Sequence, residues 1–249
     1  MTNIGVCGAN GKMGRVIYSI VSERKDCKIV AGIDINTDKY ADFTIYSTPQ
    51  EMIEKPDVII DYSNPASLDN LIDYALSSGT ALVLATTGYS AEQIEKIKKS
   101  AEQVPIFFTF NLSMGITLLV ELAKKATAFL GEQFDIEIVE KHHNQKIDAP
   151  SGTAIMLANA INEARDNSCQ FTYDRHSQRK KREKSEIGIH SIRGGTIVGE
   201  HEVIFAGRDE VITLSHQAAS KQVFAVGSVN AALFMKSQKA GLYNMSNLI

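Results

Sequence analysis

Three glycines near the N-terminus restrict the fold of this chain more than any other feature. They follow a short apolar run, residues 4–7, and precede a helical pattern. Their positions, Gly8, Gly11 and Gly14, give the spacing G-x-x-G-x-x-G, with Asn10 in place of the usual middle glycine. Such a turn between a first strand and its helix brings backbone N–H groups close to a bound phosphate. The turn alone is weak evidence, because many strand–helix turns carry glycine for steric reasons.

The residues that follow repeat the same alternation of element types. Helical patterns occur between short apolar runs that have the length of strands. We expect these strands at residues 28–33, 58–61, 81–84 and 106–108, and helices at residues 15–22, 66–76 and 91–103. An alternation of this kind builds a parallel sheet with helices on both faces. The first half is therefore predicted to be a Rossmann-like, doubly wound α/β domain that binds a dinucleotide.

An acidic residue ends the second expected strand. Asp34 lies twenty residues beyond Gly14, where a carboxylate accepts the hydrogen bonds of the adenosine ribose in dinucleotide-binding folds. The same carboxylate would repel the extra phosphate of NADPH, and the next residue, Ile35, carries no charge to offset the repulsion. Three basic residues nearby remain possible partners of that phosphate: Lys12, Arg15 and Lys39. We expect NADH, NADPH or both as cofactor, with NADH favoured.

Length and composition exclude several classes of function. A chain of 249 residues, 44% of them hydrophobic and 22% charged, can form one large or two modest globular domains. The net charge of −3 argues against a dedicated nucleic-acid binder, which carries a basic surplus. The apolar runs have strand length, far below the ~20 residues of a membrane span. Because residues 1–3 lead straight into a strand and the three cysteines are scattered, we expect no signal peptide, no disulfide framework and a cytoplasmic location.

The most informative stretch for chemistry lies between Glu140 and Ala154. It contains two adjacent histidines, His142 and His143, and histidine is the side chain that most readily exchanges a proton near neutral pH. Lys146 adds a compact positive charge close to them. Adjacent histidines are by themselves often plain surface residues. Zinc binding is another alternative, but no further Cys or His lies at ligand spacing, so we expect no metal site.

The same stretch contains the start of a helix. Pro150 suits a first helical turn, because it has no N–H group to leave without a partner. The N–H groups at Gly152 and Thr153 would favour an anion, because the start of a helix carries partial positive charge. We expect a carboxylate of the substrate to bind there.

The full string E-K-H-H-N-Q-K-I-D-A-P-S-G-T-A resembles the signature E-x-H-H-x-x-K-x-D-x-P-S-G-T-A of the dihydrodipicolinate reductase family, and every fixed position is filled. The resemblance implies NAD(P)H-dependent reduction of the (hydroxy-)dihydrodipicolinate ring to tetrahydrodipicolinate, in the diaminopimelate route to lysine. It implies that His142 is the general acid and that Lys146 stabilises developing charge and orients the substrate. His143, Gly152 and Thr153 would then hold the carboxylates of this small dicarboxylate.

Two loops after expected strands resemble segments of the same family. Residues 85–88, A-T-T-G, resemble its G-T-T-G loop, and residues 109–113, T-F-N-L-S, resemble its A-x-N-F-S-type segment. Ordinary turn chemistry is the alternative, since Thr, Gly and Asn are common in loops. Carried over by position, the resemblance implies cofactor contacts at Gly8, Ala9, Asn10, Gly11, Lys12, Met13, Ala85, Thr86, Thr87, Thr109, Phe110, Asn111 and Leu112.

The remaining chain is expected to form a second, α+β domain on a mixed or antiparallel sheet. The expected helices are residues 115–130 and 153–163, and the expected strands are residues 134–139, 187–192, 195–206 and 210–216. Residues 165–184 have no pattern, and we interpret the basic run 179–182 as a solvated loop because Glu183 and Glu186 dilute its charge. A nuclear or RNA-binding signal and the attraction of an acidic substrate are the alternatives. Residues 191–201 resemble the family's R-x-G-x-x-x-G-x-H-type hairpin, so Arg193, His201 and His216 could face the site; a packed or hydrogen-bonded role is the alternative, and their roles stay open.

These elements divide the chain into two expected domains. Residues 1–112 form the dinucleotide-binding domain, completed by residues 222–249, whose helix at 222–236 returns to it in the family that the chain resembles. Residues 113–221 form the domain for substrate binding and oligomerisation. A long apolar strand such as residues 197–205 exposes a pairing edge unless a partner covers it. We therefore expect a homo-oligomer, and the family resemblance implies a homotetramer.

Two other functions remain as alternatives. Another Rossmann-type semialdehyde or amino-acid dehydrogenase would share the glycine turn but not the H-H-x-x-K-x-D-x-P-S-G-T string. A nucleotide-sensing regulator would need a module that binds DNA or a partner, and the sequence has no recognition-helix pattern with a basic surplus.

Overall fold

The computed structural model describes residues 1–109 and 111–248, and these form two compact units. Unit 1 consists of Met1–Ser113 together with Gln222–Ile249, and unit 2 is the continuous segment Met114–Lys221. Phe110, one of the expected cofactor contacts, lies outside the described residues.

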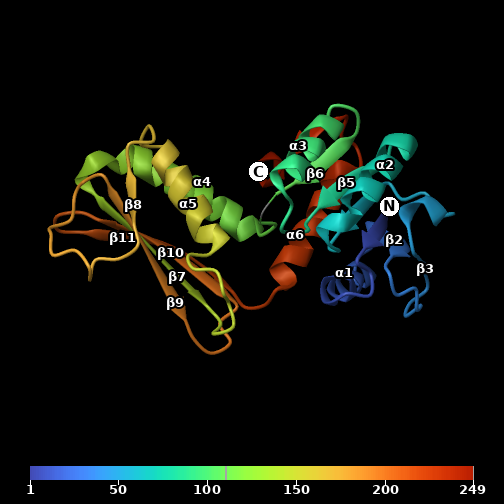
Figure 1. The fold of residues 1–249 in the computed structure, drawn as a ribbon, viewed down its shortest axis with the longest axis horizontal. Helices are drawn as coiled ribbons and strands as arrows, with labels where there is room; N and C mark the ends of the chain where they lie inside the picture. The colour runs from blue at the N-terminus through green and yellow to red at the C-terminus, as the bar shows by residue number, and fades with distance from the viewer. Residues whose placement is uncertain (110, 249) are drawn as a thin grey trace. The chain divides into compact units, whose positions relative to one another are not determined.

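Seven strands of the described part of unit 1 form one parallel sheet, in the order β12-β6-β5-β4-β1-β2-β3. Figure 1 labels β6, β5, β2 and β3 of this sheet. In chain order they are β1 Thr2–Cys7, β2 Cys27–Ile33, β3 Thr44–Tyr46, β4 Val58–Asp61, β5 Ala81–Leu84, β6 Pro105–Phe108 and β12 Gly241–Tyr243. The five strands expected from the sequence are present. The two outermost strands, β3 and β12, were not expected, because three residues are too few to show a hydrophobic period.

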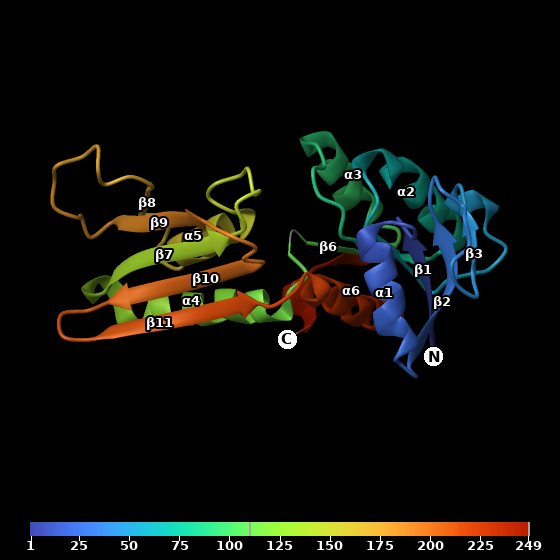
Figure 2. The same ribbon diagram turned by 90° about the horizontal axis from the view of Figure 1, so that it is seen from below.

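Helices cover both faces of this sheet, as the doubly wound prediction requires (Figure 2). They are α1 Lys12–Ser22, α2 Leu68–Ser78, α3 Ala91–Ser100 and α6 Gln222–Met235. The sheet lies between two hydrophobic cores, and alternate residues of β4 belong to one core or the other. Ile60 packs with residues of α1 and α6, including Ile17 and Val229, whereas Ile59 packs with Leu71 of α2. The predicted fold class of this half is confirmed.

Steric crowding explains the glycine spacing of the first turn. Gly8 has a φ of +78°, a left-handed conformation that an L side chain rarely adopts. A Cβ atom at Gly14 would overlap the carbonyl oxygen of Gly8 and lie 2.5 Å from that of Ala9. The backbone of α1 therefore approaches the end of β1 more closely than any residue with a side chain allows.

Five strands in residues 114–221 form the mixed sheet of unit 2, in the order β11-β10-β7-β9-β8. They are β7 Asp135–His142, β8 Gln170–Thr172, β9 Glu186–Arg193, β10 Gly199–Ala206 and β11 Val211–Ala218. The pairs β7–β9 and β8–β9 are parallel, whereas β10 runs antiparallel to both of its neighbours. Helices α4 Met114–Leu130 and α5 Gly152–Glu163 pack on one face (Figures 1 and 2).

Several expectations for unit 2 are wrong in detail. The strand expected at 195–206 begins at Gly199, because Gly195 adopts a left-handed turn with a φ of +47°. This strand, β10, lies between β7 and β11, so it exposes no pairing edge, and the edge strands are β11 and β8. The segment 165–184, expected to be irregular, contains β8.

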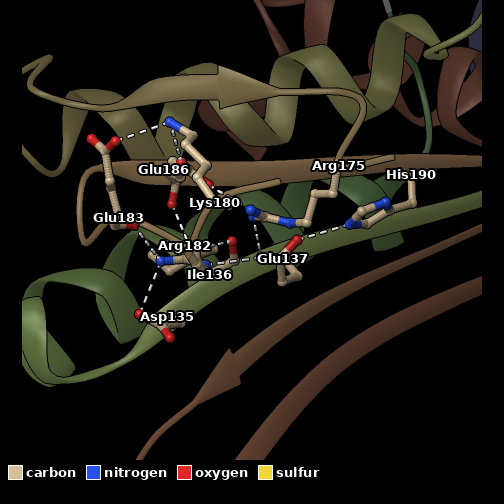
Figure 3. Close-up of polar contacts among 9 residues, drawn as sticks. All are labelled: Asp135, Ile136, Glu137, Arg175, Lys180, Arg182, Glu183, Glu186 and His190. Carbon is tan, nitrogen blue, oxygen red and sulfur yellow. Dashed lines mark hydrogen bonds and ion pairs between the residues drawn. The ribbon is translucent and has the colours of Figure 1, made fainter. Parts of the chain in front are cut away.

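Two arginines of the segment 165–184, Arg175 and Arg182, bind to the sheet of unit 2, so this segment is not a plain solvated loop. Glu137 of β7 points away from the helices and accepts hydrogen bonds from Arg175 at 3.1 Å and Arg182 at 3.0 Å (Figure 3). Arg182, whose side chain is 18% exposed, also donates to the carbonyl oxygen of Ile136 at 3.0 Å. The interpretation as a solvated loop is therefore wrong for Arg182. Its guanidinium pairs with carboxylates and backbone of its own unit.

The last long helix rejoins unit 1 by a close backbone contact. A Cβ atom at Gly227 of α6 would overlap the carbonyl oxygen of Leu112, and that residue is 4% exposed in the core. Alanine normally stabilises a helix interior by about 1 kcal/mol relative to glycine. At this position the added methyl group must instead displace backbone.

We predict that Gly227→Ala lowers the free energy of unfolding by about 1–3 kcal/mol, the usual effect of overpacking a core. Urea unfolding followed by circular dichroism measures the change. Val226→Ala, at a neighbouring position that is 40% exposed on the same helix, is the matched control and should change stability by less than about 0.5 kcal/mol. A Gly227→Ala protein as stable as the unsubstituted chain would contradict the packing argument.

Candidate active site

A buried carboxylate lies at the centre of the site in unit 2. Alternation along β7 places Glu140 on the same face as Ile136 and Ile138, under α5. Its side chain is fully buried, and its oxygens accept hydrogen bonds from Arg193 at 2.7 and 2.8 Å and from the backbone N–H of Ser151 at 3.1 Å. Burial would raise the pKa of Glu140, but these hydrogen bonds and that of His142 lower it to about 2. The carboxylate is ionised at neutral pH.

His142, the expected general acid, contacts this carboxylate directly. Its Nδ1 atom lies 2.6 Å from Oε2 of Glu140, two residues earlier on the same face of β7. Its side chain is 12% exposed, and its Nε2 atom lies beside Gly199 of β10. Burial lowers the pKa of His142, and the hydrogen bond and charge of Glu140 oppose that effect. The net effect is a pKa below the usual histidine value, and a histidine held by a carboxylate in this way can donate a proton from its other ring nitrogen.

The loop that follows β7 carries the other expected residues. Lys146 forms an ion pair with Asp148 at 2.8 Å and is 22% exposed, and this pair lowers the pKa of Asp148. The N–H group of Lys146 donates to the carbonyl oxygen of His143 at 3.1 Å, which closes a turn. Arg193 donates to the carbonyl oxygen of Asp148 at 2.7 Å. The loop is therefore tied to the end of β9.

The start of α5 lies beside the same carboxylate. Ser151 is the N-cap, and its Oγ atom accepts a hydrogen bond from Ala154 at 3.2 Å. Gly152 and Thr153 are thus the first two helical residues, as the carboxylate-binding prediction requires, and the space around Gly152 is open. The expectation for Pro150 is wrong, because it precedes the cap and lies outside the first turn.

His201, left without a role by the sequence, also reaches this site. It is 4% exposed, and its Nε2 atom lies 3.0 Å from Oγ of Ser151. Its ring packs edge-on against that of His142, with centroids 5.2 Å apart. Burial and the adjacent His142 lower the pKa of His201 to about 4, so the ring is neutral at neutral pH. Its partner in the β10–β11 register is His216.

The sequence did not single out Glu140 as a site residue, and it left the roles of Arg193 and His201 open. A sequence signal for Glu140 was available, because a strand places residues i and i+2 on one face and Glu140 precedes His142 by two residues. Arg193 lies opposite His142 through the parallel pairing of β7 with β9, and β10 brings His201 opposite Glu140. Those registers join segments about fifty to sixty residues apart, and the hairpin pattern that contains Arg193 and His201 does not show which strand it pairs with.

Unit 1 gathers the expected nucleotide-binding residues at one edge of its sheet. Residues 8–13, Asp34, residues 85–87 and residues 109–112 follow β1, β2, β5 and β6, and parallel strands end at a common edge. Gly11 is the N-cap of α1, and no described side chain caps this helix, whereas Ser90 caps α3. A pyrophosphate at the glycine turn would supply the missing acceptor. These residues therefore fit a dinucleotide.

The carboxylate of Asp34 is held in place by the glycine turn. It accepts hydrogen bonds from the backbone N–H groups of Asn10 at 2.9 Å and Asn36 at 3.0 Å. Arg15 donates to Oδ1 of Asn10 at 2.9 Å and lies 4.4 Å from the centre of the Tyr40 ring. One asparagine thus connects an acid that would bind ribose hydroxyl groups with a base that would attract a phosphate.

The two further loops differ in how their residues are placed. Thr86 is 7% exposed, and its Oγ1 atom has no hydrogen-bond partner among the described residues. The Oγ1 atom of Thr109 accepts a hydrogen bond from the N–H group of Asn111 at 3.3 Å. Leu112 is buried in the core against α6, so its side chain has a packing role. Only its backbone could contribute to cofactor binding.

Among residues 1–109 and 111–248, no group of three or more His, Cys, Asp and Glu side chains is arranged to hold a metal ion. No helix in this part of the chain has both the length and the hydropathy needed to cross a membrane.

Two family profiles together match nearly the whole chain. The profile described as "Dihydrodipicolinate reductase, N-terminus" matches residues 2–112, and that described as "Dihydrodipicolinate reductase, C-terminus" matches residues 115–249. The 4-hydroxy-tetrahydrodipicolinate reductase of Caldanaerobacter subterraneus subsp. tengcongensis is 47% identical over 249 residues, which cover 100% of this chain and 98% of that protein. The enzyme of the same name from Clostridium novyi is 46% identical, with the same coverage.

Solved structures agree with these sequence matches. A dipicolinate-bound dihydrodipicolinate reductase from Paenisporosarcina sp. TG-14 has a TM-score of 0.83 and 27% identity, over 100% of both chains. A myo-inositol dehydrogenase from Lactobacillus casei, in complex with NAD(H) and myo-inositol, has a TM-score of 0.62 over 99% of this chain and 90% of its own. At 15% identity the second match shows a shared fold alone. The resemblance indicated by the fifteen-residue string is confirmed, and the chain belongs to the dihydrodipicolinate reductase family, the NAD(P)H-dependent reductases of diaminopimelate and lysine biosynthesis.

Proposed function

We propose that unit 2 carries the substrate chemistry of this reductase and that His142 is its general acid. One observation carries the proposal: a histidine paired with a buried carboxylate lies next to the open start of α5. Unit 1 is proposed to bind the dinucleotide at its glycine turn. The bound NAD(P)H supplies a hydride to a conjugated carbon of the (hydroxy-)dihydrodipicolinate ring. His142 then donates the proton that completes the reduction, and Lys146 stabilises negative charge on the ring.

Substrate capture is assigned to the start of α5 and the loop before it. Gly152 and Thr153 occupy the first helical positions, whose N–H groups favour a carboxylate. His143 and Lys146 lie on the preceding turn, and Lys146 contributes positive charge near that position. The Paenisporosarcina enzyme is described as dipicolinate-bound, and a flat dicarboxylate of that kind fits such an anion site.

We predict that His142→Ala lowers kcat by about a hundred- to ten-thousand-fold, the usual loss when a positioned acid is removed. NADH absorbance with enzymatically generated substrate measures turnover. Calorimetry should show that NADH binding is unchanged and that dipicolinate still binds. His176→Ala, on an exposed turn of unit 2, is the control and should retain full turnover. A His142→Ala enzyme with unchanged kcat would remove this residue from the mechanism.

The proposed cofactor preference is for NADH over NADPH. Asp34 would accept the ribose hydroxyl groups, and its charge would repel a phosphate on the same ribose. Arg15, which is connected to Asp34 through Asn10, would attract that phosphate and so reduce the preference for NADH over NADPH. Each hydrogen bond to a charged group contributes about 1.5–3 kcal/mol, so a preference for NADH of roughly tenfold or more follows.

We predict that Asp34→Ser reduces this preference, because it weakens NADH binding and removes the repulsion of NADPH. The ratio of kcat/KM values for the two cofactors is the measurement. Asp42→Ser removes the same charge from an exposed position on the same unit and should leave the ratio unchanged. A strong NADPH preference of the unsubstituted enzyme would show that the basic residues of the turn outweigh Asp34.

A homotetramer assembled through the sheet of unit 2 is proposed as the state in solution. The face opposite the helices carries several apolar side chains, and two of them are largely exposed, Ile192 at 46% and Val211 at 64%. Two others, Val139 and Ile204, lie at the middle of that face. A symmetric partner would cover this face and the edge of β11.

Light scattering at micromolar concentration is expected to give four times the chain mass of 27.3 kDa. Ile192→Asp, which places a charge on the proposed interface, should shift the mass towards smaller species. A stable monomer of the unsubstituted protein would refute the assembly. The cytoplasmic location also stays a prediction, which cell fractionation would test.

A further inference from the structure

We propose that Glu140 and Arg193 act together as positioning residues that fix the protonated nitrogen of His142 and set the pH range of its acid function. The inference rests on the proposed role of His142 as general acid. Neither residue is placed in contact with the reacting atoms. Their effect passes through the imidazole ring and through the loop that carries Lys146.

The contact between Glu140 and His142 determines which ring nitrogen carries a permanent proton. Oε2 of Glu140 lies 2.6 Å from Nδ1, and an ionised carboxylate can only accept a hydrogen bond. Nδ1 must therefore carry hydrogen in both charge states of the ring. The proton that is gained and lost is on Nε2. When His142 acts as the acid, the Nε2–H bond breaks, the proton passes to the substrate, and a neutral ring remains with Nδ1–H still on Glu140.

Arg193 keeps that carboxylate ionised and correctly oriented. Two nitrogens of its guanidinium bind the two oxygens of Glu140 at 2.8 and 2.7 Å, a bidentate geometry that lysine cannot reproduce. Without this cation, a fully buried carboxylate beside a histidine would tend to take up a proton. A protonated Glu140 could donate to Nδ1 and would reverse the tautomer of the ring. The bidentate pair excludes that state.

The charges around His142 come from four elements. Glu140 on its own strand is negative, whereas Arg193 on β9 and Lys146 on the following loop are positive. His201 on β10 packs against the ring and is neutral near pH 7. Burial, Lys146 and Arg193 lower the pKa of His142, and Glu140 raises it. Removal of the negative charge on Glu140 should therefore lower the pKa of His142 further.

The same arginine couples the acid to the second catalytic residue. Its guanidinium donates to the carbonyl oxygen of Asp148, and the carboxylate of Asp148 pairs with Lys146. One side chain thus holds both the orienting carboxylate of His142 and the backbone of the residue that binds Lys146. Substitution of Arg193 should disturb both functional groups, whereas substitution of Glu140 should act on His142.

The test is the pH dependence of kcat in the full-length enzyme. The acid must be protonated to act, so kcat is full below the pKa of His142 and is lost as pH rises through it. In Glu140→Gln the ring loses its anionic partner, and the loss of activity should move to lower pH by about 1–3 units. KM for NADH should stay within about twofold. Nitrogen NMR of the His142 ring should show hydrogen on Nδ1 in the unsubstituted enzyme and a mixture of tautomers in the variant.

The protein contains a matched control on the opposite face of the same strand. Glu137 binds His190 at 2.8 Å and two arginines, so it too joins a histidine to guanidinium groups, but it lies away from the helices (Figure 3). Glu137→Gln should leave the pH profile unchanged. Arg193→Lys keeps the positive charge but loses the bidentate geometry, so it should shift the pH profile less than Glu140→Gln does. It also provides a test of the proposal if Glu140→Gln fails to fold.

The outcomes separate this inference from the proposed function. If His142→Ala abolishes turnover while Glu140→Gln and Arg193→Lys keep the profile and tautomer of the unsubstituted enzyme, the positioning role is refuted and the acid remains. If Glu140→Gln lowers kcat equally at every pH, the carboxylate is structural and the inference is again refuted. If His142→Ala retains turnover, the proposed function itself fails.

Discussion

Unit 2 depends on the burial of one charge, the carboxylate of Glu140. A charge with no contact to water is tolerated only when hydrogen bonds replace its hydration, and here Arg193, His142 and the N–H group of Ser151 do so. These donors come from β9, from β7 itself and from the cap of α5. The removal of one partner of a buried ion pair commonly destabilises a protein by about 3–5 kcal/mol. The geometry that orients the acid is therefore also part of what holds three elements together.

Much of this arrangement could be predicted from sequence, because its signals are local. The glycine spacing and Asp34 identify the nucleotide turn within thirty residues, and the string from Glu140 to Ala154 contains the acid, the lysine and the helix start in one segment. The alternation of β7 even predicts that Glu140 and His142 share a face. Periodicity and capping operate over a few residues, so a single sequence reveals them.

The remaining features depend on pairings that no local pattern records. Arg193 reaches Glu140 because β9 pairs with β7 in parallel, fifty-three positions away along the chain. The basic run 179–182 has the sequence pattern of a solvated loop, because the carboxylates that bind Arg182, such as Glu137, lie on another strand. For Arg193 and Arg182 a tertiary contact determines the surroundings of the side chain. The error at Pro150 is local: its preference for a first turn predicts a helical position, whereas Ser151 caps the helix one residue later.

The return of α6 and β12 to unit 1 has a consequence for biosynthesis. Unit 2 is a continuous segment, so all of its residues have been synthesised once Lys221 has been added. The core of unit 1 remains open at that stage, because α6 and β12 belong to the last twenty-eight residues. The part of the chain made first is thus the last to complete its sheet, and its apolar surface on β4, β5 and β6 stays uncovered until α6 and β12 have been synthesised.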